Sequence, residues 1–518
     1  MRKMMTLLLI AAATVAYGQD NLPSDFHRLT LEQALQQFDK SNNAAGMGLF
    51  QPASGSQTYL KGFYSAGNFH LAQQGSSDPG FEFATLRYDS LGEKLFMKGS
   101  FHYTFDSEKG RAWSDVRDPW FSIPYIYGCD IAKDYDTHNC GLTFDLYTSP
   151  LNDIISLGIK TTYEVADISG KRDPRPRTGY LDYQLVPSAM LTFGRHHIGL
   201  GAGYGYSKEK LTNLTTVQSN PNIYYYKMSG LDNIDGALSA YSGFKRQFAG
   251  SRFLTEATYS YGGEAVSLLV GGGMQYSRLD AIGDKMQTPG SYNCFRYNAL
   301  GDLVVKGGRT LHKIHLSGVM DDGGADEYLQ ELVNTKDEVT GVATETWNTL
   351  YTYTNRYMLK KLDAALDYTL YGGYTGTDYL WSAAIGAEYS KWSKLFYLPE
   401  SNFGTSGIRL SAGGSVLLLR AKGHKIDLEA KGGYYMHGDT YKSFVSENVY
   451  TQQVLDKDYD YYCHNFAFAS AALTWTFPMN LGKAGYANGY VRLTGNATRA
   501  LPAGNLNAAS LAIGLFTF

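Results

Sequence analysis

The sequence has little of what several common protein classes need. Its 518 residues include only four cysteines, too few for a fold held together by disulfides. The formal net charge of −3 argues against a phosphate-backbone ligand, and therefore against nucleic-acid binding. After the first twenty residues no apolar run approaches the roughly 20 residues of a transmembrane helix, and the stretch 265–273 is apolar but short. If the chain crosses a membrane, it must do so with strands.

Motifs that carry catalysis are also missing. The sequence has no nucleophile elbow, no phosphate-binding glycine loop and no HExxH element. Acidic loop clusters such as 456–460 are better explained as solvated charge than as Ca²⁺ ligands. Several histidines are interpreted as ordinary strand residues: His102, His196, His197, His312 and His315. We therefore expect no enzyme activity, no cofactor and no metal site.

Aromatic residues and glycine are abundant. The chain has 42 tyrosines, 57 glycines and 14% aromatic residues, but only 14 prolines. This composition is typical of an all-β protein whose aromatic rings lie at a boundary between polar and apolar surroundings.

The N-terminus resembles a cleavable signal peptide. Arg2 and Lys3 form a positive start, residues 4–15 are apolar, and 16–18 supply small residues for a peptidase. We expect cleavage after Gly18. A retained anchor is the alternative, but about twelve apolar residues are too few to cross a bilayer. No cysteine lies near the cleavage site, so we expect no lipid anchor.

Segments of about ten residues alternate between apolar and polar side chains. In 95–105 the apolar residues share one face and the polar residues share the other, and 362–370, 426–432 and 487–495 repeat the pattern. A soluble β-sandwich alternates too, but its strands usually have about five or six residues. Length and export favour a transmembrane, antiparallel, up-and-down β-barrel in the outer membrane of a Gram-negative cell, surrounded by outer-membrane lipid.

Connection lengths predict the topology of this barrel. Eight short connections are expected as periplasmic turns, and five long polar stretches as extracellular loops. The turns lie at 90–93, 149–152, 194–195, 249–251, 307–309, 376–378, 421–423 and 480–483. The loops lie at 106–137, 166–180, 207–235, 321–357 and 438–460. Together with a first strand near 57–65 and a last at 506–518 they give 18 strands, and 14 or 16 are also acceptable, because 264–279 alternates weakly.

The segment before the barrel is expected to be a short helical leader. Leu31, Leu35 and Phe38 fall on one face of a helix over 29–39. The leader either packs at the lower rim of the barrel, which we favour, or plugs the lumen. The chain is thus divided into a signal peptide (1–18), a periplasmic leader or plug (19–56) and a barrel (57–518).

Two strands carry charges that must avoid lipid. Such charges are expected to face the lumen, where they either set the polarity of a pore or form an ion-pair network that stiffens a plugged barrel. They are Lys361, Asp363, Asp367, Lys425, Asp427, Glu429 and Lys431. In an outer loop, Cys129 and Cys140 match no common zinc spacing, and a loop disulfide is the more plausible expectation.

The last strand ends in Phe516, Thr517 and Phe518. An aromatic final residue with another two positions earlier resembles the signal read by the barrel assembly machinery of the outer membrane. That machinery is therefore an expected partner.

A wider resemblance rests on the segment 171–177 (KRDPRPR), the two strands after it, and the stretch 120–127 (WFSIPYIY). These are similar to an uncharacterised family of Bacteroidota outer-membrane barrels, a domain of unknown function. Residues 43–46 (NAAG) also resemble the Asn-Pro-Ala-Gly element of fatty-acid-transporter-type barrels, with Ala44 in place of the proline. The first resemblance implies a surface or uptake role beside a TonB-dependent receptor. A surface lipoprotein is the alternative partner.

Three functions remain open from the sequence. The favoured one is a porin-like channel, or an accessory component of small-molecule uptake. The alternative is a plugged structural or surface-binding barrel that presents its loops to a protein or glycan partner. The least favoured is a barrel hydrolase.

Overall fold

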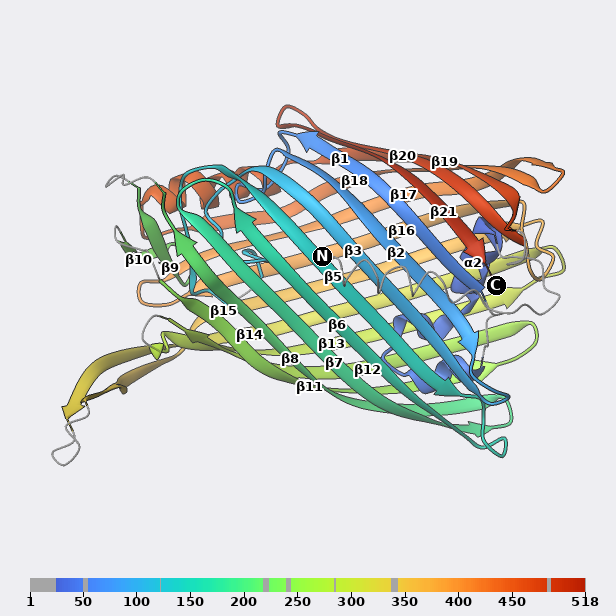
Figure 1. Ribbon diagram of the computed structural model, residues 1–518, viewed down its shortest axis with the longest axis horizontal. Helices are drawn as coiled ribbons and strands as arrows, with labels where there is room; N and C mark the ends of the chain where they lie inside the picture. Colours follow the sequence, from blue (N-terminus) through green and yellow to red (C-terminus); the bar gives the residue numbers. More distant parts are fainter. Residues whose placement is uncertain are drawn as a thin grey trace.

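The computed structural model describes residues 25–49, 55–121, 123–217, 223–238, 244–283, 286–336, 343–481 and 486–517. Eighteen antiparallel strands form one closed sheet, as the alternating segments predicted. The sheet closes where β1 pairs with β21, with Ser56 opposite Thr517 and Gly67 opposite Leu506. Figure 1 shows the strands running obliquely around the cylinder.

The barrel strands, in order around the wall, have the following bounds: β1 (Gly55–Gly67), β2 (Ser77–Ser90), β3 (Leu95–Arg111), β5 (Lys133–Thr148), β6 (Ile155–Gly170), β7 (Arg175–Phe193), β8 (His196–Thr215), β11 (Arg246–Gly262), β12 (Val266–Ile282), β13 (Gly290–Lys306), β14 (Thr310–Lys336), β15 (Ala343–Gly372), β16 (Trp381–Phe396), β17 (Ser401–Ala421), β18 (His424–Ser443), β19 (Phe466–Asn480), β20 (Tyr486–Ala500) and β21 (Gly504–Thr517). No helix among the described residues is both long enough and apolar enough to span a membrane.

The two faces of the wall differ as the alternation requires. In β21, Ile513 is 58% exposed on the outer face while its neighbour Ala512 is buried. In β8, Leu200 is 65% exposed, and in β7 Leu191 is exposed while Met190 is fully buried. Large apolar side chains therefore cover the outside of the cylinder, which suits contact with lipid rather than water.

The two ends of the barrel have different connections. At the end where β1 begins and β21 ends, which we call the turn end, neighbouring strands are joined by short connections such as 194–195 between β7 and β8. At the opposite end, the loop end, several connections are long and contain their own secondary structure. The β14–β15 hairpin also extends past this end, as the yellow ribbon in Figure 1 shows.

The strand count of 18 is confirmed, but one expected turn was wrong. Residues 249–251 lie inside β11, and the real turn is 263–265, after which 266–282 forms β12. Small residues at 249–251 suggested a turn, but Gly250 serves a close approach between strands, because an added Cβ would lie 1.8 Å from the Arg278 carbonyl oxygen. Because one wrong turn was predicted and one true turn was missed, the predicted number of strands was unchanged.

Two expected loops were also wrong in extent. Most of the segment 166–180 is strand, since β6 runs to Gly170 and β7 begins at Arg175. Most of 321–357 belongs to the extended β14 and β15. Polar residues in both segments continue the strands beyond the apolar belt, where either face can be polar.

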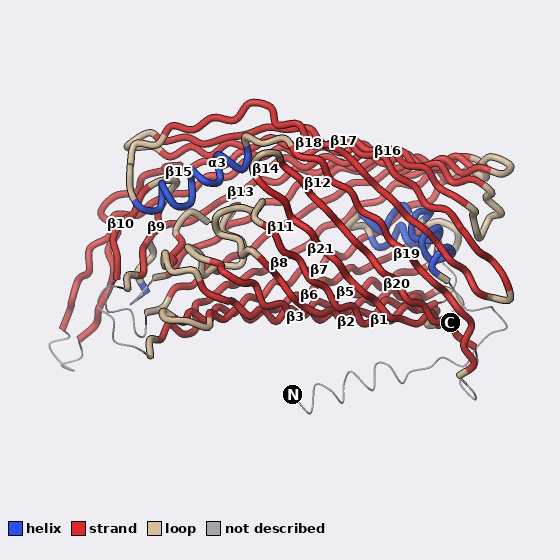
Figure 2. The backbone as a smooth tube through the Cα atoms, turned by 90° about the horizontal axis from the view of Figure 1, so that it is seen from above, coloured by secondary structure: helices blue, strands red, loops and turns tan. Residues whose placement is uncertain are grey.

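Three connections fold inward at the loop end, and we call their described parts the loop-end seal: 112–132, 216–245 and 444–465. They contain a small sheet of β4 (Ile126–Gly128), β9 (Tyr225–Ser229) and β10 (Asn233–Leu238), and the helical turns η4 (Thr451–Leu455) and α3 (Asp456–Tyr462). Their apolar side chains pack against inward-facing strand residues such as Phe248, Tyr357 and Trp392. Figure 2 shows α3 lying over this end.

The described part of the leader, residues 25–49, is helical and is called the N-terminal plug below. It consists of α2 (Phe26–Leu35), η1 (Gln37–Lys40) and η2 (Ala44–Leu49). Asp25 caps α2, because its carboxylate accepts a hydrogen bond of 3.0 Å from the Arg28 backbone N–H. In Figures 1 and 2 these helices lie at the turn end, surrounded by strands.

Candidate functional site: the plugged lumen

The N-terminal plug makes side-chain contacts around much of the inner wall. Gln37 donates to the Asp302 carbonyl oxygen of β13 at 2.9 Å, and Lys313 of β14 donates to the Ala34 carbonyl oxygen at 2.5 Å. Asp39 pairs with Lys98 of β3. Because these strands lie on different sides of the cylinder, the plug occupies the lumen. The favoured prediction of a leader packed at the lower rim was therefore wrong, and the alternative of a plug describes these contacts.

The middle of the plug is held by one carboxylate. Glu256 of β11 accepts hydrogen bonds from the Ser41 hydroxyl at 2.5 Å and from the Asn42 side-chain amide at 2.9 Å. The next residue, Asn43, donates to the Thr258 hydroxyl at 2.9 Å. A backbone that turns through 41–43 is therefore fixed by two inward positions of a single strand.

Apolar packing completes the plug interface. Phe38, Ala45 and Met47 pack with a cluster of wall residues that includes Tyr147 and Met190. Gly158 of β6 lies so close to η2 that an added Cβ would stand 2.2 Å from the Ala45 nitrogen. The plug thus combines buried apolar contacts with directed polar ones.

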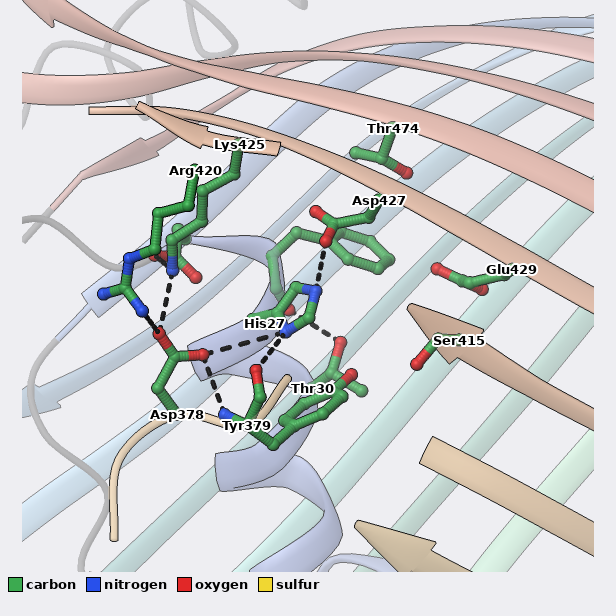
Figure 3. A network of polar contacts seen from close by, with 12 residues as sticks. His27, Thr30, Asp378, Tyr379, Ser415, Arg420, Lys425, Asp427, Glu429 and Thr474 are labelled. Atoms are coloured by element: carbon green, nitrogen blue, oxygen red, sulfur yellow. Dashed lines mark hydrogen bonds and ion pairs between the residues drawn. The ribbon is translucent and has the colours of Figure 1, made fainter. Parts of the chain in front are cut away.

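The start of the plug carries an ion-pair network, which we call the latch: Asp25, His27, Asp378, Lys425 and Asp427. The His27 Nε2 contacts Asp427, and Nδ1 lies 3.2 Å from the Tyr379 carbonyl oxygen and 3.7 Å from Asp378. Carbonyl and carboxylate oxygens both accept hydrogen bonds, so a ring nitrogen that carries a proton has an acceptor beside it. The His27 ring lies between the carboxylates of Asp378 and Asp427, as Figure 3 shows.

Lys425 supplies an ammonium group to the latch. Its Nζ lies 2.6 Å from Asp25 and 3.1 Å from Asp378. Burial alone would raise the pKa of Asp25, but the charge and hydrogen bond of Lys425, together with the Arg28 N–H, bring that pKa below its ordinary value. The latch joins the plug to β18 and to the β15–β16 connection.

A polar cavity lies beside the plug at the turn end. Its volume is about 370 Å³, and Phe26 and Thr30 of the plug form one side. The other side is lined by β15 to β20, where serine, glycine and alanine leave space and where Glu429 and Arg492 form an ion pair of 2.7 Å. We call this space the turn-end cavity.

The charged residues singled out in the sequence fall into three groups. Lys425 and Asp427 belong to the latch, whereas Asp367, Glu429 and Lys431 line the turn-end cavity. Lys361 and Asp363 pair with each other at 2.8 Å nearer the loop end, where the Lys361 Nζ lies 4.6 Å above the Phe121 ring. The structure does not bring all seven together.

The expected loop disulfide does not form. All four cysteines are free thiols. Cys129 packs in a loop cluster with Tyr127 and Leu211, whereas Cys140 lies seven residues along β5, opposite Val165. At roughly 3.3 Å per strand residue, Cys140 is about 23 Å from the start of β5, too far for a bond to that loop.

The expected assembly signal lies in β21. Phe516 faces inward, fully buried, with its ring 4.9 Å from the Tyr490 ring. Phe518 lies outside the described residues. The expected signal peptide also lies outside them.

The loop-end seal was missed by the analysis of the sequence. Asp115, buried in the seal, pairs with Arg246 at 3.2 Å and accepts a 2.6 Å hydrogen bond from the Tyr225 hydroxyl. The Glu209 carboxylate of β8 also forms an ion pair with Arg246, at 3.0 Å. One signal was available, because the apolar stretch 120–127 is unusual for a loop exposed to water. Within the described ranges, no three His, Cys, Asp or Glu residues are placed to hold a metal ion.

Comparisons place the chain among known proteins only broadly. Solved structures similar to it include "Copper transporter OprC" (10% identity, TM-score 0.35, covering 90% of this chain and 81% of that one). The ferric yersiniabactin uptake receptor FyuA from Yersinia pestis matches at 9% identity with a TM-score of 0.32, covering 90% and 80%. The CymD monoaromatic hydrocarbon channel matches at 9% with 0.31, covering 93% of each chain.

No curated protein sequence matches the chain significantly. A family model does match, over residues 44–517, from η2 of the plug to the end of β21. The chain therefore belongs to DUF6850, a family of unknown function.

Proposed function

We propose that the protein is an outer-membrane barrel for small-molecule uptake, with the N-terminal plug as its gate. The apolar outer face of the closed cylinder supports a place in a membrane, and short turns at one end with long connections at the other support the outer membrane. By the same rule the turn end faces the periplasm and the loop end faces outward.

One observation carries the proposal. Among the described residues, no backbone-to-backbone hydrogen bond joins the plug to a strand, and each hydrogen bond between the plug and the wall involves at least one side chain. The barrel closes through β1 and β21 without any help from the plug. The plug can therefore leave the lumen without opening a strand pair, as a gate must and a structural element need not.

The turn-end cavity supports the same proposal. It already gives the plug a polar, open side, so withdrawal of α2 widens an existing space of about 370 Å³. The latch charges that this movement separates would then face water, where ions are well solvated. The second barrier on the path is the loop-end seal, which must also move when a solute passes.

Single-channel recording in planar bilayers tests the proposal. The wild-type barrel should be mostly closed, and a chain that lacks residues 25–49 should show longer and more frequent openings. A variant with the plug intact but Arg420 changed to alanine is the control, because Arg420 is 59% exposed at the edge of the latch. If plug removal leaves a folded barrel as silent as the wild type, the gate proposal is wrong.

The second candidate is a permanently plugged barrel that presents its loops to a protein or glycan. The apolar loop-end seal favours it, because residues such as Trp113, Ile123 and Val454 are buried in a packed core. The same recordings separate the two functions, since this candidate predicts silence in every folded variant.

We also propose that the barrel assembly machinery reads the end of β21. The inward-facing Phe516 is fixed against Tyr490, so its role as a signal would be exercised before the barrel closes. Replacement of Phe518 by alanine should reduce the amount of folded barrel in the outer membrane without changing the stability of barrels that do assemble. Pull-down with a tagged chain tests the further expectation of a TonB-dependent receptor or surface lipoprotein as partner.

A further inference from the structure

A second cavity opens at the loop end, away from the plug. Its volume is about 460 Å³, within the range of roughly 300 to 1,000 Å³ that small-molecule sites occupy. We call it the loop-end pocket. It is formed where the β1–β2 connection, the end of β3, the segment 130–132, α3 and the β20–β21 turn meet.

The pocket has an apolar floor that is firmly held. Phe69 stacks on Tyr461 with ring centroids 4.5 Å apart, and Trp113 packs edge-on against Tyr450. The Trp113 indole N–H donates to the Gln453 side-chain oxygen at 3.0 Å. Because these residues are fixed by each other, the shape of the pocket does not depend on a ligand.

The pocket wall mixes hydrogen-bond donors and acceptors. His70 and His464 each use Nδ1 on a backbone carbonyl oxygen, at 2.9 and 2.5 Å, and neither Nε2 has a partner among the described residues. Lys457 adds a cation, and Asp130 and Asp460 add carboxylates. Within the same part of the chain, Lys457 and Asp460 have no ion-pair partner.

This mixture excludes several ligand classes. An anion would meet two carboxylates, and a cation would meet Lys457. A hydrocarbon would strip water from all these groups without replacing its hydrogen bonds. A hydroxyl group both donates and accepts, so several hydroxyls on a compact carbon frame satisfy the wall and the floor together.

We propose that the loop-end pocket binds a neutral, hydroxyl-rich molecule of the size of a mono- or disaccharide. The purpose of such a site rests on the proposed uptake function, because the pocket lies at the end where a solute would enter. Binding itself does not require transport. It can therefore be tested separately from gating.

Isothermal titration calorimetry on the full chain in detergent tests the site. The probes are maltose, cellobiose and lactose, with inorganic phosphate and decane-1-sulfonate as charged and apolar comparisons. At least one disaccharide should bind, with Asp460→Asn and His70→Ala each weakening it at least tenfold. Lys431→Ala, which alters only the turn-end cavity, should leave binding unchanged, and heat-modifiable mobility should confirm that every variant is folded.

The inference is overturned if no disaccharide binds to the folded wild type, if phosphate or the sulfonate binds in preference, or if binding survives both pocket variants. Failure of the plug proposal would look different. In that case sugar binding would persist while the plug-deleted barrel stayed silent in bilayers.

Discussion

Removal of the Asp427 carboxylate should loosen the N-terminal plug and leave the barrel intact. Asp427 and His27 have side chains that are only 2% and 1% exposed, so Asp427→Ala leaves a buried imidazole without its nearest hydrogen-bond partner. Loss of one partner from a buried hydrogen bond to a charged group costs about 1.5 to 3 kcal/mol. Asp378, 3.7 Å from the same ring, is too distant to replace this hydrogen bond, so the cost here should be about 2 to 3 kcal/mol.

This cost predicts a measurable rate. At about 1.36 kcal/mol per factor of ten, the plug should leave the lumen about 30 to 150 times more often than in the wild type. Hydrogen exchange of peptides that cover residues 26–49 measures this directly, because protected amides exchange when the plug is out. Peptides from β5 and β6, far from the latch, should exchange at wild-type rates.

Two further variants decide whether the latch is responsible. Arg420→Ala removes an exposed pair with Asp378, worth at most about 1 kcal/mol, so plug exchange should rise less than about fivefold. His27→Ala should add little in a chain that already carries Asp427→Ala, because the coupled partner is gone. If Asp427→Ala exchanges like the wild type, or if plug and strands exchange faster together, the reasoning is refuted.

Three other predictions concern pH and packing. Since the folded pKa of Asp25 is lowered, its contribution to plug docking should be complete above the ordinary value of 3.8 and lost as the pH falls below it. Hydrogen exchange of the plug should therefore accelerate below that pH in the wild type but not in Asp25→Asn. Burial raises the pKa of Asp458 in α3 to about 6, although the Ala72 N–H opposes this shift, so docking of α3 should weaken as the pH rises from about 4 to 6. Hydrogen exchange of the 451–462 peptide measures this slope, and Asp458→Asn should flatten it. An unchanged slope in the variant would contradict the assignment. Gly158→Val should displace η2, because its Cβ would lie 2.2 Å from the Ala45 nitrogen. The expected result is faster hydrogen exchange of residues 44–49 in a barrel that is still folded and heat-modifiable. Gly92→Val is the control, because nothing lies within 4 Å of a Cβ at that position.

The barrel itself could be predicted from the sequence because a strand between lipid and lumen must alternate. In β18, Leu428 faces out while Asp427 and Glu429 face in, and a shift of one residue would put both carboxylates in lipid. The same penalty applies to every strand of the barrel. The prediction of a barrel therefore does not depend on any single turn, such as the wrong one at 249–251.

The closure of the lumen could not be predicted in the same way. The plug depends on contacts between distant positions, such as His27 with Asp427 or Ser41 with Glu256, and no local pattern pairs them. The loop-end seal depends on Asp115 meeting Arg246 across more than one hundred residues. The polar residues of these segments indicated loops, but not that the loops turn inward.

The gate is tested most directly by locking it. In a chain whose four native cysteines are changed to serine, cysteines at Ala45 and Ser188 would join the plug to β7, because the Ala45 backbone nitrogen lies 3.1 Å from the Ser188 hydroxyl. Solute uptake into liposomes should stop when this bond is oxidised and return when it is reduced. Uptake that continues at the same rate through the locked barrel would contradict the account.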